Sequence, residues 1–469
     1  MNDLKKRNTE WMGAAGAVPK VSALAVAVVV TLAVVSGATV AGAQSNDSLQ
    51  AQIDALDQKI RVVERLSEIA KEDAKAAAAK QNKVNAGPGN LGIASADGAF
   101  SLRYSGFVQI AGRHFIDVPA ASPNHAHDFG LRRVQTDIRG TAFKNFGWRV
   151  HTNFAGNAVN LLDVQFDWNL LPEFNLSVGK FKPPTGLERL LSSPRAPFIE
   201  GSFVTALQPS RDIGAQASGN FGKGLVQYQA GVFNGANDNQ DNASEVDPKK
   251  DFYARVFAHP FNNGSEALKG FGLGVSASYG ERENAGTLTA IPTAGRQSFQ
   301  PFTNDTLDGT LSRLSPQAYY YYGPFGVIAE YTQTTQEVRS GANQGELTNS
   351  AWALTGSWVL TGEKNDYRGG PKVAKANNWP TGNNFGAIEL LARVHGITID
   401  EATAGTFGPS NQNHGIESAL SAGGALGWYL NNSFKIFLSY EHTAFTDVAA
   451  APAERKAENV LSFSFNAAY

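Results

Sequence analysis

The 469-residue chain contains no cysteine and only 2 methionines. Without cysteine, neither a disulfide framework nor a thiolate metal site can form. Charged residues make up 17% of the chain, below the roughly 25% usual in soluble domains. The formal net charge is −2, so nothing in the charge balance suggests a nucleic-acid partner. The sequence also lacks the GxSxG, HExxH and P-loop patterns, by which many hydrolases, metalloproteases and nucleotide-binding enzymes are recognised.

Residues 1–43 have the organisation of a secretory signal peptide. Four basic residues, the last of them Lys20, accompany an apolar run over residues 21–40, and residues 41–43 (Ala-Gly-Ala) form a small-residue cleavage site. Basic, apolar and small regions in this order are typical of secretion signals. An uncleaved membrane anchor is the alternative, because about 20 apolar residues can span a bilayer. Cleavage would remove four basic and two acidic residues and change the formal charge from −2 to about −4.

Residues 44–84 are predicted to form a coiled-coil helix. They contain no proline and no aromatic residue, and Leu49, Ile53, Leu56, Ile60 and Val63 recur at alternating spacings of four and three. This spacing is a heptad seam. A single amphipathic helix is the simpler interpretation, but so narrow an apolar stripe needs a partner to bury it. We therefore expect copies of the chain to associate here, and we expect the glycine- and asparagine-rich residues 85–98 to form a linker.

From residue 99 to residue 469 the sequence alternates with a period of two. Val134 and Ile138, for example, alternate with Arg133, Asp137 and Arg139. About sixteen segments of roughly ten residues repeat such a pattern, as a bacterial outer-membrane barrel would require. Successive side chains of a strand point to opposite faces, so each segment has an apolar face and a polar face. A soluble sheet would bury the apolar face, whereas a transmembrane barrel turns it to lipid and lines a water-filled interior with polar groups.

Loop lengths and the last strand favour the barrel. Short connections, such as residues 144–147 and 431–432, alternate with long ones that we expect to be outer loops, over residues 181–211, 235–250, 281–315 and 362–384. Leu461, Phe463, Phe465 and the terminal Tyr469 share one face, and a stripe that ends on a terminal aromatic residue is read by the barrel-assembly machinery. The sequence therefore predicts an all-β fold, a 16-stranded antiparallel transmembrane β-barrel over residues 99–469, preceded by a short periplasmic coiled-coil helix. The expected location is the outer membrane of a Gram-negative bacterium.

Four segments resemble the phosphate-selective porin family, that of porins O and P. They are FGLRRVQTDIRG from Phe129, VGKFKPPTGLE from Val178, VFNG over residues 232–235, and WVLTGE over residues 358–363. The resemblance covers about residues 100–469. It implies a trimeric sixteen-stranded barrel whose third outer loop folds inward and narrows the pore. It also implies an anion preference, with basic residues along the route.

Basic residues on inward faces and in the long loop are therefore the candidate anion pathway. Arginine presents a rigid fork that matches phosphate oxygens. The candidates are Arg133, Arg139 and Arg149 on predicted strands, and Lys182, Arg189, Arg195 and Arg211 in the loop. The simpler interpretation is that these cations pair with nearby acids, since Asp137, Asp163, Glu188 and Glu200 are close in sequence.

The predicted function is a passive outer-membrane channel for small anions, with phosphate or polyphosphate as candidate solutes. The alternative is a non-specific porin whose coiled coil tethers the outer membrane. No catalytic residue, cofactor or metal site is predicted, and His125 and His127 beside Asp128 are interpreted as polar loop residues. The expected partners are outer-membrane lipid, further copies of the chain in a homotrimer, the barrel-assembly machinery through the strand that ends at Tyr469, and small anions such as phosphate.

Overall fold

The computed structural model describes residues 46–469, apart from residues 88–89, 117–126, 243, 246, 286–289, 300–305, 405–415 and 448–454. The predicted signal peptide at residues 1–43 lies outside the described residues. The chain divides into two compact units, Met1–Ala79 and Lys80–Tyr469, and each unit is considered by itself.

The described part of the first unit is the helix α2, Asn46–Lys80. The predicted seam lies on one helix, and Leu49, Ile53, Leu56 and Ile60 are between 46% and 56% exposed. No helix in the described part of the chain is long and apolar enough to cross a membrane. The helix is confirmed, and its association with other copies stays a prediction.

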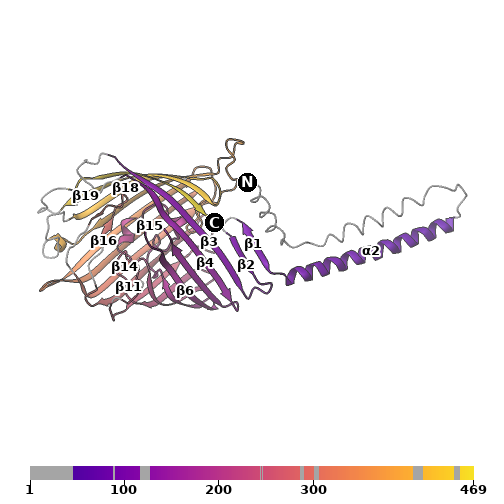
Figure 1. The fold of residues 1–469 in the computed structure, drawn as a ribbon, viewed down its shortest axis with the longest axis horizontal. Coiled ribbons are helices and arrows are strands. Elements are labelled where there is room, and N and C mark those ends of the chain that lie inside the picture. The colour runs from indigo at the N-terminus through magenta and orange to yellow at the C-terminus, as the bar shows by residue number, and fades with distance from the viewer. Residues whose placement is uncertain are drawn as a thin grey trace, which may run out of the picture. The chain divides into compact units, whose positions relative to one another are not determined.

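The second unit is a closed antiparallel β-barrel of sixteen strands within the described residues, as the sequence predicted (Figure 1). Each strand pairs with its neighbour in the chain, and β20 pairs with β3 to close the barrel, with Phe463 opposite Gly112. The strands are β3 Ser101–Ile116, β4 Asp128–Ala142, β5 Phe146–Asn153, β6 Asn160–Leu171, β7 Phe174–Phe181, β8 Asp212–Phe221, β9 Val226–Phe233, β10 Asp251–Ala258, β11 Phe271–Arg282, β14 Thr306–Tyr322, β15 Phe325–Ser340, β16 Asn343–Val359, β17 Ala387–Thr398, β18 Ile416–Tyr429, β19 Phe434–Asp447 and β20 Glu458–Ala468.

Short elements occupy some of the connections. The strands β12 (Ile291–Pro292) and β13 (Ser298–Phe299) form a small ribbon between β11 and β14. The single turns η1 (Ser193–Arg195) and α3 (Phe203–Ala206) lie between β7 and β8, and η2 (Glu401–Ala404) follows β17. The turn η1 and the helix α3 give local order to a connection of thirty residues, which we name the internal loop (residues 182–211).

The expected linker differs from the structure. Residues 83–94 contain a hairpin of β1 (Lys83–Gly87) and β2 (Asn90–Ala94). β2 pairs with the start of β3, with Leu91 opposite Tyr104. On the same edge of β3, Tyr469 exchanges two backbone hydrogen bonds with Gly106, at 2.8 and 3.1 Å. β3 thus extends beyond the end of β20, and the hairpin satisfies backbone groups that would otherwise form an open edge.

Side chains alternate between the two faces of the barrel wall. On β19, Leu438 and Tyr440 are 45% and 41% exposed on the outer surface, whereas Phe437, Ser439 and Glu441 are buried inside. Register shifts interrupt several strand pairs. One of them, a bulge opposite Gln109 and Ile110 of β3, leaves Arg132 without a partner in the ladder. A bulge turns two consecutive residues towards one face, so Arg132 and Arg133 both reach the interior.

One expected outer loop lies at the other end of the barrel. Residues 362–384 were expected outside, but β16 runs towards the end that carries the short turns and Tyr469, so residues 360–386 connect β16 to β17 at that end. The alternating direction of the strands fixes this placement, whereas the expectation relied on length alone. We name residues 360–386 the long turn.

Candidate functional site

The internal loop crosses the barrel interior and is fixed to the opposite wall. The N–H groups of Leu187 and Glu188 both donate to Oε2 of Glu330 on β15, at 2.9 and 3.0 Å. The N–H of Phe203 donates to Nδ1 of His395 on β17 at 3.2 Å. Because Glu330 and His395 are buried on the inward faces of their strands, these contacts place the loop inside the lumen, as the resemblance implied.

Two arginines of the wall, Arg132 and Arg393, hold the middle of the internal loop. Glu200 accepts from Nε and Nη2 of Arg132, both at 2.7 Å. Arg393 of β17 donates to the carbonyl oxygen of Glu200 at 2.9 Å and to both carboxylate oxygens of Glu441 at 2.7 and 2.9 Å. The side chain of Arg393 is 0% exposed. The negative charge of Glu200 is therefore neutralised by a basic residue of the wall.

Three of the predicted pathway residues belong to a line of ion pairs that joins β4, β5 and β6 to the end of the internal loop. Asp137 accepts from Arg149 at 2.9 Å and from Arg139 at 2.6 Å. Asp163 accepts from Arg149 at 3.1 Å and from Arg211 at 2.9 Å. Three arginines share two carboxylates here, so most of their positive charge is compensated. The structure brings Arg139, Arg149 and Arg211 together in the way that the simpler interpretation described.

Two further predicted residues donate to neutral groups. Nη1 and Nη2 of Arg133 each lie 3.3 Å from the carbonyl oxygen of Ile199, and Nη1 also contacts Gln109. Lys182 donates through Nζ to the carbonyl oxygen of Leu191 at 2.7 Å. Burial, together with the positive charge of Arg211, lowers the pKa of Lys182 to about 7.

Arg189 is directed into the internal loop. Its Nη2 donates to the carbonyl oxygen of Gln208 at 3.2 Å and to Oδ1 of Asn239 at 3.1 Å, and it also contacts the carbonyl oxygen of Thr205. Neutral acceptors in two connections therefore hold its guanidinium group. This arrangement favours a structural contribution from Arg189.

Arg195 and Lys435 are two further basic residues near the internal loop that form no ion pair among the described residues. The guanidinium group of Arg195 is exposed to the interior and has no hydrogen-bond or ion-pair partner among the described residues. Lys435 of β19 lies with Nζ 5.2 Å from the ring centroids of Tyr429 and Phe437. It lines a small cavity together with Ser193 and Ala196, on either side of Arg195. Two positive charges therefore face the interior without a paired carboxylate in the described chain.

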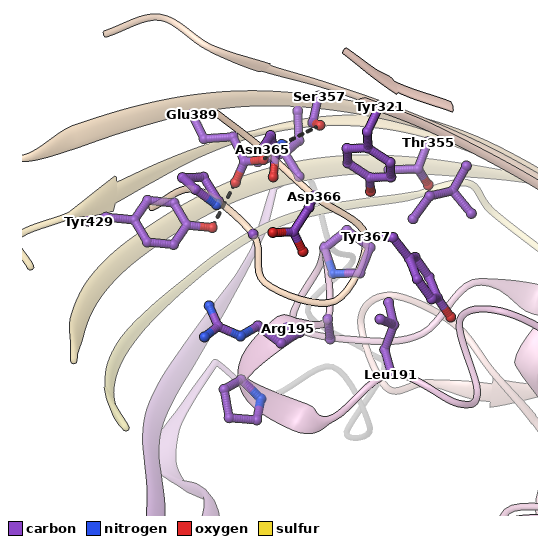
Figure 2. A pocket seen from close by; sticks show the side chains of 17 residues that line it. Leu191, Arg195, Tyr321, Thr355, Ser357, Asn365, Asp366, Tyr367, Glu389 and Tyr429 are labelled. Atoms are coloured by element: carbon purple, nitrogen blue, oxygen red, sulfur yellow. Dashed lines mark hydrogen bonds between the residues drawn. The ribbon is translucent and has the colours of Figure 1, made fainter. Parts of the chain in front are cut away.

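The long turn folds into the lumen from the other end and meets the internal loop. Nδ2 of Asn365 donates to Glu389 at 2.9 Å and to Ser357 at 3.0 Å, which ties the turn to β17 and β16. A pocket remains between the two segments. Figure 2 shows this pocket, with Arg195 and Leu191 on the internal loop, Asp366 and Tyr367 on the long turn, and Glu389 and Tyr429 on the wall.

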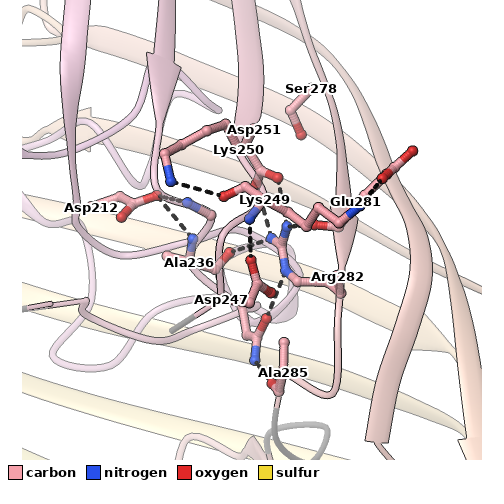
Figure 3. A network of polar contacts seen from close by, with 12 residues as sticks. Asp212, Ala236, Asp247, Lys249, Lys250, Asp251, Ser278, Glu281, Arg282 and Ala285 are labelled. Carbon is pink, nitrogen blue, oxygen red and sulfur yellow. Dashed lines mark hydrogen bonds and ion pairs between the residues drawn. The ribbon is translucent and has the colours of Figure 1, made fainter. Parts of the chain in front are cut away.

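Another cluster of charges is centred on Asp251 of β10 and Arg282 of β11 (Figure 3). Arg282 donates to both oxygens of Asp251 at 2.6 and 2.9 Å, and the two side chains are 1% and 0% exposed. Arg313 pairs with Asp238 at 2.7 Å. A buried pair of this kind leaves little net charge for a passing ion, so this part of the wall is structural.

Three basic residues of the site were absent from the predicted set. The alternation on β19 and β17 places Lys435 and Arg393 inward, so a complete reading of strand parity could have found both. Arg132 depends on the bulge opposite Gln109 and Ile110, for which the sequence carried no signal. Within the described residues, no group of three or more histidine, aspartate or glutamate side chains could hold a metal ion.

Known proteins are similar to this chain in sequence and in fold. The family described as phosphate-selective porin O and P matches residues 108–468. Porin O of Pseudomonas aeruginosa is 24% identical over 385 residues, which cover 75% of this chain and 85% of that protein.

Two solved structures share the barrel at 10% identity. The outer-membrane channel DcaP of Acinetobacter baumannii aligns with a TM-score of 0.51 and covers 79% of this chain and 98% of its own. The trimer form of OmpT of Vibrio cholerae aligns with a TM-score of 0.50 and covers 79% and 100%. The family match extends over most of the barrel and the internal loop. The chain is an outer-membrane β-barrel porin of a Gram-negative bacterium and belongs to the phosphate-selective porin O and P family.

Proposed function

We propose that this porin is a passive channel that prefers small anions. The observation that carries the proposal is the pair Arg195 and Lys435, whose charges face the interior beside the internal loop without a carboxylate partner in the described chain. Elsewhere in the described lumen, Arg149, Arg282, Arg313 and Arg393 pair with acids, whereas Arg133, Lys182 and Arg189 donate to neutral groups. The carboxylates of Asp366 and Glu389 line the same pocket as Arg195, so a positive net field near the loop is part of the proposal.

The expected strength of this field follows from the geometry of a narrow pore. An unpaired charge attracts an anion roughly 8 Å away by about 2 kcal/mol at an effective dielectric constant of about 20. Salt screens such an attraction over about 10 Å at 0.1 M ionic strength. Two charges of this size favour anions over cations moderately, and the preference should fade as salt is added. The family name supports phosphate as one of the anions carried.

The test replaces both charges and leaves the loop anchors in place. Arg195→Gln combined with Lys435→Gln should lower the anion-to-cation permeability ratio in planar bilayers. The control is Lys144→Gln combined with Lys223→Gln, which removes the same charge from exposed positions in short turns between β4 and β5 and between β8 and β9. The control should shift the ratio much less. Equal shifts from the two variants would contradict the proposal.

We also propose that the channel is a homotrimer whose copies meet along the helix α2. Its seam residues are about half exposed, although a heptad stripe is stable only when a partner covers it. OmpT, which shares the barrel fold, is described in a trimer form. Cross-linking of copies through cysteines introduced on the seam tests the idea, because the natural chain has no cysteine.

A further inference from the structure

Leu187 is the point at which the barrel wall, the internal loop and the long turn meet. Its N–H donates to Oε2 of Glu330 on β15 at 2.9 Å. Its carbonyl oxygen accepts from the hydroxyl group of Tyr367 on the long turn at 2.6 Å. One residue of the loop is thus held from the wall on its N–H and from the long turn on its carbonyl group.

The residues around this contact are rigidly packed. The ring of Tyr367 stacks on Tyr319 of β14, with centroids 4.7 Å apart and planes inclined by 16°. The side chain of Leu187 is 0% exposed and packs with Phe257 and Ile328. Water therefore cannot reach the carbonyl oxygen of Leu187 to replace the hydroxyl group of Tyr367. Loss of this hydrogen bond would leave a buried carbonyl group unpaired, which is unfavourable.

The long turn is in turn fixed to its own end of the barrel. The backbone N–H of Asn365 donates to the carbonyl oxygen of Gly323 at 2.9 Å, and the N–H of Val373 donates to Oδ1 of Asn432 at 3.1 Å. Together with the bonds from the Asn365 side chain to Ser357 and Glu389, these contacts leave Tyr367 little freedom. A group that is fixed in this way can transmit its position to the loop.

We propose that the long turn positions the internal loop from the periplasmic side, and that Tyr367 is the positioning residue. The hydroxyl group of Tyr367 and the carboxylate of Glu330 hold Leu187 between them, so they set the place of the loop that carries Arg195. The inference goes beyond the proposed anion preference, because it concerns the width and steadiness of the passage. A change in the long turn would thus alter the constriction, although the changed residue would not contact the solute.

Tyr367→Phe tests the inference, because it removes the hydroxyl group and keeps the ring. The matched control is Tyr321→Phe, since Tyr321 lines the same pocket and its hydroxyl group makes no hydrogen bond within the described residues. Single-channel recording in planar bilayers measures the open-state current. Occupancy here means the fraction of open time spent at a second conductance level, distinct from that of the main open state. We expect Tyr367→Phe to raise this occupancy about fivefold, the ratio that corresponds to a lost hydrogen bond of about 1 kcal/mol. Tyr321→Phe should leave the occupancy unchanged.

Glu330→Gln serves as a second variant. A glutamine amide would place an N–H₂ group near the Nε2 of Gln208 or the backbone N–H groups that now donate to Glu330, so this variant should also raise the occupancy of the second level. If Tyr367→Phe matches the natural protein while Glu330→Gln does not, the long turn does not position the loop. If both match it, the loop placement does not set the current, and the inference is again wrong. If the unmodified porin prefers cations, the proposed function is wrong. The comparison of Tyr367→Phe and Glu330→Gln with the unmodified porin still tests the position of the internal loop.

Discussion

Replacing Glu441 with glutamine should lower the free energy of unfolding of the barrel by about 3 kcal/mol, the low end of the range for breaking a buried ion pair. Arg393 is fully buried and donates to both oxygens of Glu441 at 2.7 and 2.9 Å. Glutamine would leave the guanidinium group without its main counter-charge. The low end applies because Glu188 lies 3.5 Å away and the carbonyl oxygen of Glu200 accepts at 2.9 Å, so part of the charge stays compensated.

Urea unfolding in detergent micelles, followed by tryptophan fluorescence, measures the change. The double variant Arg393→Met with Glu441→Leu should be more stable than Glu441→Gln alone, because it removes both buried charges. Asp57→Asn in the exposed pair with Arg61 on α2, whose side chains are 57% and 76% exposed, should cost at most about 0.5 kcal/mol. A cost below about 1 kcal/mol for Glu441→Gln, or a double variant less stable than the single one, would refute the electrostatic account.

Four other changes test separate parts of the structure. Ile138→Arg on the outer face of β4 should destabilise the barrel by about 2–4 kcal/mol and block its assembly. If Ile138→Arg assembles normally while Arg139→Leu fails to assemble, the inner and outer faces are assigned backwards. Ile53→Cys should give cross-links between copies in intact assemblies, and their absence would remove the coiled coil. Arg189→Glu with Arg195→Glu should turn the pore towards cations more than Lys249→Glu with Lys250→Glu, and equal shifts in reversal potential would mean that the internal loop is not the filter. Because the pKa of Lys182 is lowered to about 7, its charge is present at about pH 6 and lost at about pH 8, so the anion preference should fall over this interval, and Lys182→Arg should abolish the fall.

The strands could be predicted from the sequence because each carries its own signal. Alternation such as that of Leu438 and Tyr440 with Ser439 and Glu441 follows from the chemistry of a wall with lipid outside and water inside, and it needs no knowledge of distant residues. The same logic explains why Arg139 and Arg149 were placed inward correctly.

The connections could be predicted less well, because their positions depend on contacts far apart in the chain. Glu330 and Leu187 are separated by 143 residues, and no local pattern indicates that one holds the other. Tyr319 stacks on Tyr367 inside the barrel, and this contact follows from the infolding of the long turn, which no local pattern indicates. The inward position of the Arg132 side chain depends on a bulge that interrupts the alternation of faces along β4.

The central claim is that the uncompensated charges of Arg195 and Lys435 give the pore an anion preference. The measurement that tests it most directly is the zero-current potential of the natural protein in a planar bilayer under a salt gradient. The potential should have the sign of an anion-selective pore, and its size should decrease as the total salt concentration is raised, because salt screens the field. A potential with the sign of a cation-selective pore, or a potential of zero at low salt, would contradict the account.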